Sequence, residues 1–355
     1  MRSILVIIFI AFVSLNTVEA QLFPSLQGEA LQAALVDEFK PTVILSSAGS
    51  KDSLYAVVEN INGTVECVYT GYTVSLTPNT DPSQDVFAQN INQEHVFPRS
   101  QGVDNTPAEY DMHHLFPSRV DVNGDRGSLP FGEVPDNQAN KWFINASTSG
   151  SVPSSNIDGY SELWENNAFE PRESKKGDIA RAMFYVYTMY ENFIDTDYFM
   201  SQVETLCEWH HMDPVDEKEY NRSQLVGSFQ SGKANPFTLD CTLAERLFCE
   251  APSEPCNDFS TSTDEKFGTE DLNLTIFNSG SQNPVVQLNT NQPAQLQIRL
   301  INQLGHTIQE WDVRSNDQTP HTFQLNKTGL QKGLFFIQIN NITNHYTMVE
   351  KVLIP

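Results

Sequence analysis

The stretch NQEHVFPRS, residues 92–100, places a carboxylate next to an imidazole, at Glu94 and His95. A second stretch, EYDMHHLFPSRVDVNGDRGSLPFGEV at residues 109–134, adds the amide oxygen of Asn123. Carboxylate and amide oxygens suit a hard cation such as Mg²⁺, which keeps several waters and takes one or two protein oxygens. A neutral imidazole beside that cation can accept a proton from an attacking water. The two stretches therefore contain the groups needed to hydrolyse a phosphodiester.

These residues resemble the secreted bacterial endonuclease I family, which are non-specific nucleases of the His-Me finger (ββα-metal) class. Two further blocks carry the resemblance, FEPRESKKGDIARAMFYVYTMY at 169–190 and EWHHMDPVDEKEYNRSQLVGSFQSGKANPF at 208–237. Four blocks in the right order are a far stronger signal than a lone motif. The resemblance covers residues 21–256 and implies an α+β nuclease domain with the metal between the two arms of the finger.

The resemblance also implies a role for each residue of the site. His95 is expected to be the general base that takes a proton from the attacking water. Glu94 and Asn123 are expected to bind one Mg²⁺, which Ca²⁺ or Mn²⁺ can replace. Arg99 and Arg126 are expected to stabilise charge in the transition state. For Arg126 the alternative is a structural ion pair with one of the many nearby acids.

Three more polar residues are predicted to support this site. Glu109 falls where the family carries an acidic residue near the metal, so it is expected to hold a metal-bound water. The adjacent His113 and His114 invite a zinc interpretation. Neighbours in a strand point to opposite faces, which disfavours two histidines on one ion. One of the two is therefore expected to orient the site or to lie in the core.

The predicted partners are DNA and RNA, contacted through their backbones rather than their bases. The formal net charge of -24 is unusual for a nucleic-acid-binding protein, so contacts must come from a local cationic strip and the metal. We expect a monomer. The cations predicted to contact the nucleic-acid backbone are Arg119, Arg172, Arg181 and Lys233.

The first twenty residues are predicted to be a signal peptide, with Arg2 before the apolar run 4–13 and a cut before Gln21. No later stretch is long and apolar enough to span a membrane, so we expect a secreted protein, free or attached to the cell surface. The predicted nuclease domain is 21–258, and the serine- and threonine-rich segment 259–269 is a predicted linker.

Residues 270–355 are predicted to form a small all-β sandwich, because short alternating strands are separated by turns. This part resembles the C-terminal sorting domain of type IX secretion, through the blocks LINQLGHTI at 300–308 and LQKGLFFIQI at 330–339. The implied partner is the secretion machinery.

The local pattern predicts further elements. Helices are expected at 27–39, 51–58, from 178 onward and at 202–211, and a strand is expected at 63–76. Residues 77–85 and 140–158 are predicted loops, and Asn123-Gly124-Asp125 is a predicted turn. The five cysteines, Cys67, Cys207, Cys241, Cys249 and Cys256, leave at least one unpaired, and their pairing stays open.

Two other functions fit parts of the sequence. One is a surface-binding protein or adhesin in which a nuclease fold has lost its activity. The other is a metal-dependent phosphodiesterase that acts on small diesters. The first predicts no cutting of a plasmid, and the second predicts turnover of a model diester without cutting of long DNA.

Overall fold

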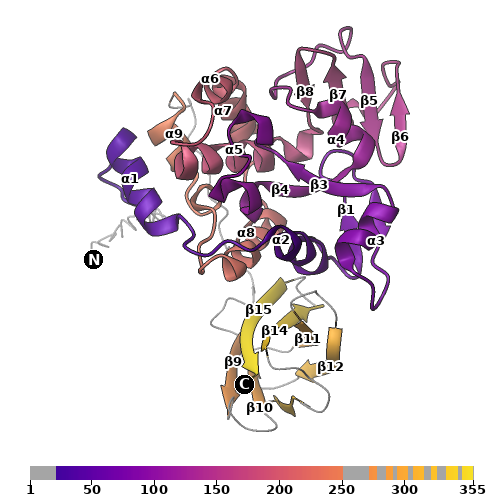
Figure 1. Cartoon of the computed structure of the whole chain (residues 1–355), viewed down its shortest axis with the longest axis vertical. Coiled ribbons are helices and arrows are strands. Elements are labelled where there is room, and N and C mark those ends of the chain that lie inside the picture. The colour runs from indigo at the N-terminus through magenta and orange to yellow at the C-terminus, as the bar shows by residue number, and fades with distance from the viewer. Residues whose placement is uncertain are drawn as a thin grey trace, which may run out of the picture.

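The computed structural model describes residues 21–250 without a break, and then the ranges 272–277, 285–290, 294–302, 307–315, 321–325, 333–342 and 346–354. The predicted signal peptide and linker, and the predicted boundaries at 258 and 270, lie outside these residues. Figure 1 shows a larger mixed part above and a strand-rich tail below. The α-helices of the larger part are α1 (Gly28–Phe39), α2 (Ser47–Ser53), α3 (Pro82–Ala88), α4 (Val120–Arg126), α5 (Lys176–Tyr190), α6 (Thr196–Met200), α7 (Val203–Met212), α8 (Glu217–Phe229) and α9 (Thr242–Leu247).

Helix α5 is the centre of the larger part, and every one of its residues is buried. The helix predicted from residue 178 onward is therefore present, begins two residues earlier and is covered on all of its faces. Its buried charges have partners: Arg181 donates to Glu219 at 2.5 Å and Asp178 accepts from Lys175 at 2.6 Å. Gly177 allows the close approach of the chain that follows α7, because a Cβ atom there would lie 1.9 Å from the carbonyl oxygen of Asp213.

Helix α3 begins inside the segment 77–85, so the loop predicted there is wrong in its second half. The side chain of Asp81 accepts a hydrogen bond from the backbone N–H of Gln84 at 2.9 Å, and Pro82 occupies the first turn. An N-cap aspartate followed by proline is a helix start signal. The helix predicted at 51–58 is present as α2 followed by a buried π-helical turn, Leu54–Val58.

The strand predicted at 63–76 is instead a small antiparallel pair, β1 (Thr64–Glu66) and β2 (Thr73–Ser75). The segment predicted as the loop 140–158 contains β5 (Lys141–Ile144) and β6 (Ser147–Ser149). Asn145, between these strands, has a φ of 48°, a left-handed conformation that asparagine tolerates and that tight hairpin turns need.

A four-stranded antiparallel sheet in the order β6-β5-β7-β8 forms one end of the larger part (Figure 1). Its other two strands are β7 (Ser161–Trp164) and β8 (Ala168–Glu170). Glu162 on β7 lies directly opposite Glu170 on β8. Both side chains are buried, and Lys176 at the start of α5 pairs with Glu170 at 2.8 Å.

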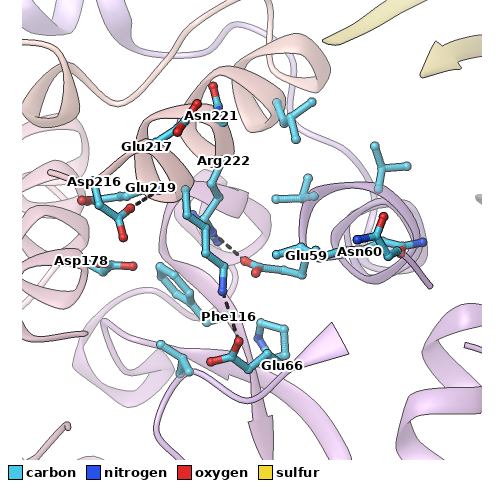
Figure 2. Close-up of a pocket in the computed structure, with 18 of the residues that line it drawn as sticks. Glu59, Asn60, Glu66, Phe116, Asp178, Asp216, Glu217, Glu219, Asn221 and Arg222 are labelled. Atoms are coloured by element: carbon cyan, nitrogen blue, oxygen red, sulfur yellow. Dashed lines mark hydrogen bonds and ion pairs between the residues drawn. The ribbon is translucent and has the colours of Figure 1, made fainter. Parts of the chain in front are cut away.

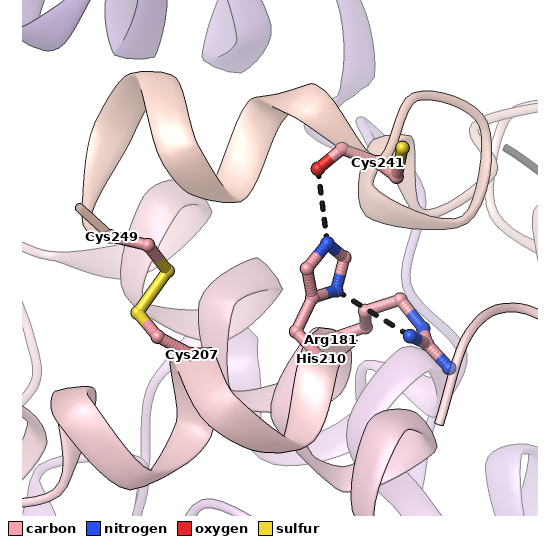
Figure 3. Close-up of a disulfide and its surroundings, with 5 residues drawn as sticks. All are labelled: Arg181, Cys207, His210, Cys241 and Cys249. Atoms are coloured by element: carbon pink, nitrogen blue, oxygen red, sulfur yellow. Dashed lines mark hydrogen bonds between the residues drawn. A yellow bond between two sulfur atoms is a disulfide. The ribbon is translucent and has the colours of Figure 1, made fainter. Parts of the chain in front are cut away.

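A disulfide joins Cys207 on α7 to Cys249, just beyond α9 (Figure 3). Cys241 is also disulfide-bonded, whereas Cys67 is buried and free. The expectation of at least one unpaired cysteine is therefore confirmed. Figure 3 also shows His210 between the backbone oxygen of Cys241 and the side chain of Arg181, at 3.0 and 3.4 Å.

The tail contains two antiparallel sheets, in the orders β13-β10-β9 and β12-β11-β14-β15. Leu296, Ile298 and Leu300, whose alternation predicted a strand, are buried in the tail's own core. The strands are β9 (Leu272–Phe277), β10 (Val285–Thr290), β11 (Ala294–Asn302), β12 (Thr307–Ser315), β13 (His321–Gln324), β14 (Gly333–Asn341) and β15 (Tyr346–Ile354).

The middle of strand β14, residues 335–339, is buried on both faces. Phe335 and Ile337 face the core of the tail, whereas Phe336 and Ile301 belong to the core of the larger part. The rings of Phe336 and Phe229, the last residue of α8, are 4.8 Å apart. The consecutive apolar residues in LFFIQI fit a strand that is covered on both sides.

Candidate active site

Glu94 and His95 are the last two residues of strand β3 (Ile91–His95), which pairs antiparallel with β4 (Leu115–Arg119). Glu94 lies opposite Phe116 and His95 lies opposite Leu115. Helix α4 follows β4 directly, so the chain runs strand, strand, helix. The Asn123-Gly124-Asp125 turn predicted from the sequence is wrong, because all three residues lie within α4.

The Glu94 carboxylate is only 2% exposed and is held by two donors. Its Oε1 accepts from the Tyr69 hydroxyl at 2.7 Å and from Arg126 Nη1 at 3.1 Å. Burial raises the pKa of Glu94, and the positive charge of Arg126 opposes that rise. A further cation at this carboxylate would favour its ionised form in the same way.

The His95 imidazole has one nitrogen occupied. Its Nε2 lies 2.9 Å from the backbone oxygen of Glu109, and a carbonyl can only accept, so Nε2 carries the proton. Nδ1 is then the nitrogen with a free lone pair. Burial of the ring lowers the pKa of His95 to about 3, with a smaller effect from His114. The ring is therefore neutral at ordinary pH and able to accept a proton.

Two side chains of α4 attach this helix to β3. The amide nitrogen of Asn123 donates to Asn92 Oδ1 at 3.0 Å and to the backbone oxygen of Gln93 at 3.1 Å. One turn later, Arg126 donates to the backbone oxygens of His95 at 3.1 Å and Val96 at 2.8 Å. Residues three apart share one face of a helix. Because the amide nitrogen of Asn123 is used, its carbonyl oxygen is the group left to bind a ligand.

These bonds also explain why a seven-residue helix forms over an Asn-Gly pair. Gly127, with a φ of 54° and a ψ of −121°, ends the helix in a positive-φ conformation that suits glycine. The chain thus leaves the helix at Gly127, beyond the Asn123-Gly124 pair on which the turn prediction rested.

Arg99 is the exposed cation beside His95, with 53% of its side chain accessible. It pairs with Asp104 and, at 2.8 Å, with Glu109 Oε1. Glu109 Oε2 accepts from the backbone N–H of Asn105 at 2.9 Å. Both carboxylate oxygens of Glu109 therefore have protein partners, and its backbone oxygen is the group that contacts His95.

His113 and His114 lie in a 3-10 turn rather than in the predicted strand. Each is buried and uses Nε2 on a backbone oxygen, His113 on Lys233 at 2.8 Å and His114 on Ala108 at 2.8 Å. The His114 ring packs 5.6 Å from that of His95. His114 therefore packs beside His95, whereas His113 lies in the core with its ring 4.7 Å from that of Tyr185.

Several arginines predicted to contact substrate are buried. Arg126 and Arg181 are 1% and 0% exposed, and Arg119 is 4% exposed and donates to Asp121 and to backbone oxygens beyond β5. A buried guanidinium bonded to protein oxygens cannot reach a phosphate, so these predictions are wrong for direct contact. Arg172 is half-buried and pairs with Glu66 at 2.5 Å, and Lys233 pairs with Glu38 at 3.2 Å.

Sequence reasoning missed Tyr69 and Lys51. Tyr69 is 25 positions from Glu94 in the sequence, and no spacing rule links the two. Lys51 on α2 is close enough to His95 for its charge to lower the pKa of that ring. Both come from segments that precede the recognised blocks.

Comparison with known proteins finds two matching regions in the chain. Residues 39–241 match the family described as Endonuclease I, and residues 282–355 match the secretion system C-terminal sorting domain. Within the described residues, no helix is long and apolar enough to cross a membrane.

Similar curated proteins include ribonucleases and deoxyribonucleases. An extracellular ribonuclease of Bacillus amyloliquefaciens is 31% identical over 161 residues, which are 41% of this chain and 50% of that protein. An extracellular ribonuclease of Bacillus subtilis is 29% identical over 184 residues, 46% of this chain and 57% of that protein. An extracellular deoxyribonuclease of Aeromonas hydrophila is 28% identical over 155 residues, 43% of this chain and 56% of that protein.

This chain spans about half the length of the curated relatives that it matches. The sorting domain and the extracellular relatives identify a secreted protein. Since the matched segment 39–241 is more than half of the chain and contains Glu94, His95 and Asn123, the chain belongs to the Endonuclease I family.

Proposed function

We propose that this chain is a secreted, metal-dependent endonuclease that hydrolyses phosphodiester bonds of DNA and of RNA and leaves 5′-phosphates. The observation that carries the proposal is the attachment of α4 to β3 by Asn123 and Arg126. This attachment fixes α4, which carries the amide oxygen of Asn123, against β3, which carries the Glu94 carboxylate and the His95 imidazole. The β3-β4-α4 order also supports assignment to the His-Me finger class.

The donor set fits one hydrated Mg²⁺. Glu94 and the free carbonyl oxygen of Asn123 would hold it, and waters would complete its coordination. Among the described residues, no group of three or more His, Cys, Asp or Glu side chains is placed to bind a metal ion, so a zinc or multi-carboxylate site is not favoured. When bound, Mg²⁺ supplies stabilisation of the negative charge that develops on the phosphate and the leaving oxygen.

His95 carries out the proton transfer. A water attacks phosphorus while His95 Nδ1 takes one of its protons. The bond from phosphorus to the 3′ oxygen breaks, and the 3′ oxygen leaves with the electron pair and takes a proton from a solvent water. The Glu109 carbonyl holds Nε2–H and so fixes which nitrogen is the base. His114 supports the ring from the side. Lys51 and the exposed Arg99 are the cations placed to bind the phosphate, and Arg99 would exchange its contact with Asp104 or Glu109 for that contact. Arg126 is buried and committed to Glu94 and backbone oxygens.

The proposal is tested with supercoiled plasmid, single-stranded RNA and a small model diester, each with Mg²⁺ and with a chelator. We expect Mg²⁺-dependent nicking of the plasmid and cleavage of the RNA, and 5′-phosphates on the products. Turnover of the model diester without plasmid cutting would favour the small-substrate phosphodiesterase. No turnover of any of the three with Mg²⁺, Mn²⁺ or Ca²⁺ would favour an inactive binding protein.

A further inference from the structure

A cavity of about 530 Å³ lies between the larger part and the tail, away from Glu94, His95 and Asn123. Its walls come from the start of α8, from the π-helical turn and the chain after it, and from residues 340–342 of the tail. Figure 2 shows Arg222 between the residues at the start of α8 and the segment that carries Glu59 and Asn60. This volume is in the range of small-molecule sites.

Much of the cavity wall is aliphatic or aromatic. Ile61 of the larger part and Ile342 of the tail line the cavity and are 47% and 45% exposed. Large exposed apolar side chains on both sides of a cavity favour a ligand with a hydrocarbon body. The other apolar wall residues include Val57, Val58, Phe116 and Leu225.

The cations of the cavity are neutralised by its own carboxylates. Arg222 pairs with Glu59 at 2.6 Å and its guanidinium carbon lies 3.8 Å from the centre of the Phe116 ring. Glu66 accepts from Arg172 at 2.5 Å and from Lys218 at 3.3 Å.

The remaining lining cation, Lys175, pairs with Asp178 at 2.6 Å. The carboxylate of Glu219, which lines the cavity, pairs at 2.5 Å with Arg181, which is not a lining residue. An anionic ligand would therefore have to break existing ion pairs to bind.

The six lining carboxylates exceed the five cations named above by one negative charge, because Glu66 pairs with two cations, and this excess lies at Asp216 and Glu217. Within the described residues neither forms an ion pair, and both line the cavity (Figure 2). Asp216 accepts the backbone N–H of Glu219 at 2.7 Å as the N-cap of α8, and this bond leaves its negative charge in place. Asn60 and Asn221 also line the cavity, although the side-chain oxygen of Asn60 already accepts from the backbone N–H of Gly63 at 2.7 Å.

We propose that this cavity binds a linear polyamine. Ammonium groups would be held by Asp216 and Glu217, and the methylene chain would lie along the apolar wall. A polyamine combines both features, because its charges are separated by short hydrocarbon segments. The proposal is independent of nuclease activity, since the site shares no residue with the candidate active site.

The test is a calorimetric titration of the full-length protein with spermidine, without nucleic acid and at constant ionic strength. We expect saturable binding at one site. The double variant Asp216→Asn, Glu217→Gln should bind more weakly by about tenfold or more, since it loses two charge-assisted contacts. Asparagine can still cap α8, so the variant should stay folded, and the melting temperature verifies this. Glu217→Gln alone should weaken binding by a smaller factor.

A matched control removes the same net charge elsewhere, by Glu165→Gln and Asp197→Asn on exposed surfaces. Spermidine affinity should be unchanged in this control. 1,6-Hexanediol, which has the chain without charge, should not bind, and Ile342→Asn should weaken spermidine by removing part of the apolar wall. Spermidine binding that does not saturate would show diffuse surface attraction and overturn the proposal. An equal loss of affinity in the control and in the Asp216→Asn, Glu217→Gln variant would do the same.

Discussion

The Arg126 guanidinium lies 3.1 Å from Glu94 Oε1, with both side chains nearly excluded from solvent. The same arginine donates to the backbone oxygens of His95 and Val96. One residue of α4 thus fixes both the carboxylate proposed to bind metal and the strand that carries the proposed base. Its role is to position these groups rather than to contact phosphate.

Replacement of Arg126 by methionine should destabilise the fold. The change leaves the Glu94 carboxylate buried without its cation, which typically costs about 3–5 kcal/mol. Urea unfolding monitored by tryptophan fluorescence measures the loss. Lys233→Met is the control, because its partner Glu38 is 60% exposed and an exposed ion pair contributes about 0–1 kcal/mol. Equal effects of the two changes would contradict the positioning role.

Replacement of His95 by alanine should slow plasmid nicking by roughly 10²–10⁴-fold, the usual contribution of a general base. Metal affinity should stay close to that of the wild type, because the proposed ligands are Glu94 and Asn123. Initial nicking rates and a calorimetric Mg²⁺ titration separate the two effects. His211→Ala, on α7, is the control. Activity within a few-fold of wild type would remove His95 from its assigned role.

Tyr69→Phe should raise the Mg²⁺ concentration needed for half-maximal rate and leave the rate at saturating Mg²⁺ nearly unchanged. The lost hydroxyl donates to Glu94 Oε1 at 2.7 Å and acts on the metal through that carboxylate. Asn123→Ala should raise the Mg²⁺ requirement further, because a direct ligand is lost. Tyr72→Phe is the control, since its hydroxyl contacts the backbone oxygen of Gln89 at 3.4 Å. Unchanged metal dependence in both test variants would place the metal elsewhere.

These results separate what the sequence could predict from what it could not. Glu94, His95 and the helix near 178 follow from local motifs and periodicity, which are properties of short segments. The contact of Tyr69 with Glu94 joins segments that no local pattern links. Helix α4 shows the converse, because hydrogen bonds to β3 outweigh the turn preference of Asn123-Gly124.

The predicted cationic strip for nucleic acid shows the same limit of sequence-based prediction. A sequence gives the charge of Arg119 and Arg181 but not their burial, and solvent exposure decides whether a guanidinium can meet a phosphate. The pairing of Cys207 with Cys249 likewise depends on the packing of α7 against the end of α9. Both are properties of the tertiary fold.

Fold stability should fall as pH rises through the range in which Glu162 loses its proton. Burial, followed by the charge of Glu170, raises the pKa of Glu162 to about 8. The folded state therefore binds this proton more tightly than the unfolded state, whose pKa is about 4.3. The stabilising contribution is complete below about pH 4 and is lost progressively by about pH 8.

Glu162→Gln should consequently make the free energy of unfolding less dependent on pH over that range. Urea unfolding at several pH values measures this slope. Glu165→Gln, on the exposed turn after β7, should leave the slope unchanged. A slope that Glu162→Gln does not alter would show that other groups control the dependence.

Nucleic-acid cutting should depend only weakly on salt. Binding falls with salt in proportion to the phosphates neutralised, by a slope of about −0.9 per contact on duplex DNA. Arg119, Arg126 and Arg181 are buried, which leaves few cations for phosphate. We expect a logarithmic slope of about −3 or shallower in the initial rate against NaCl at saturating Mg²⁺. A steep monotonic fall from low salt would reveal a basic groove elsewhere.

The packing of Phe336 against Phe229 has a consequence for use of the tail as a fusion tag on other proteins. Attached to an unrelated passenger protein, the sheet that contains β14 would present Phe336 and Ile301 to water, because no aromatic partner would cover them. Such chimeras should self-associate, and light scattering would detect the larger particles. In the chimera neither residue packs against the larger part of this protein. Replacing both by serine should therefore restore monodisperse particles.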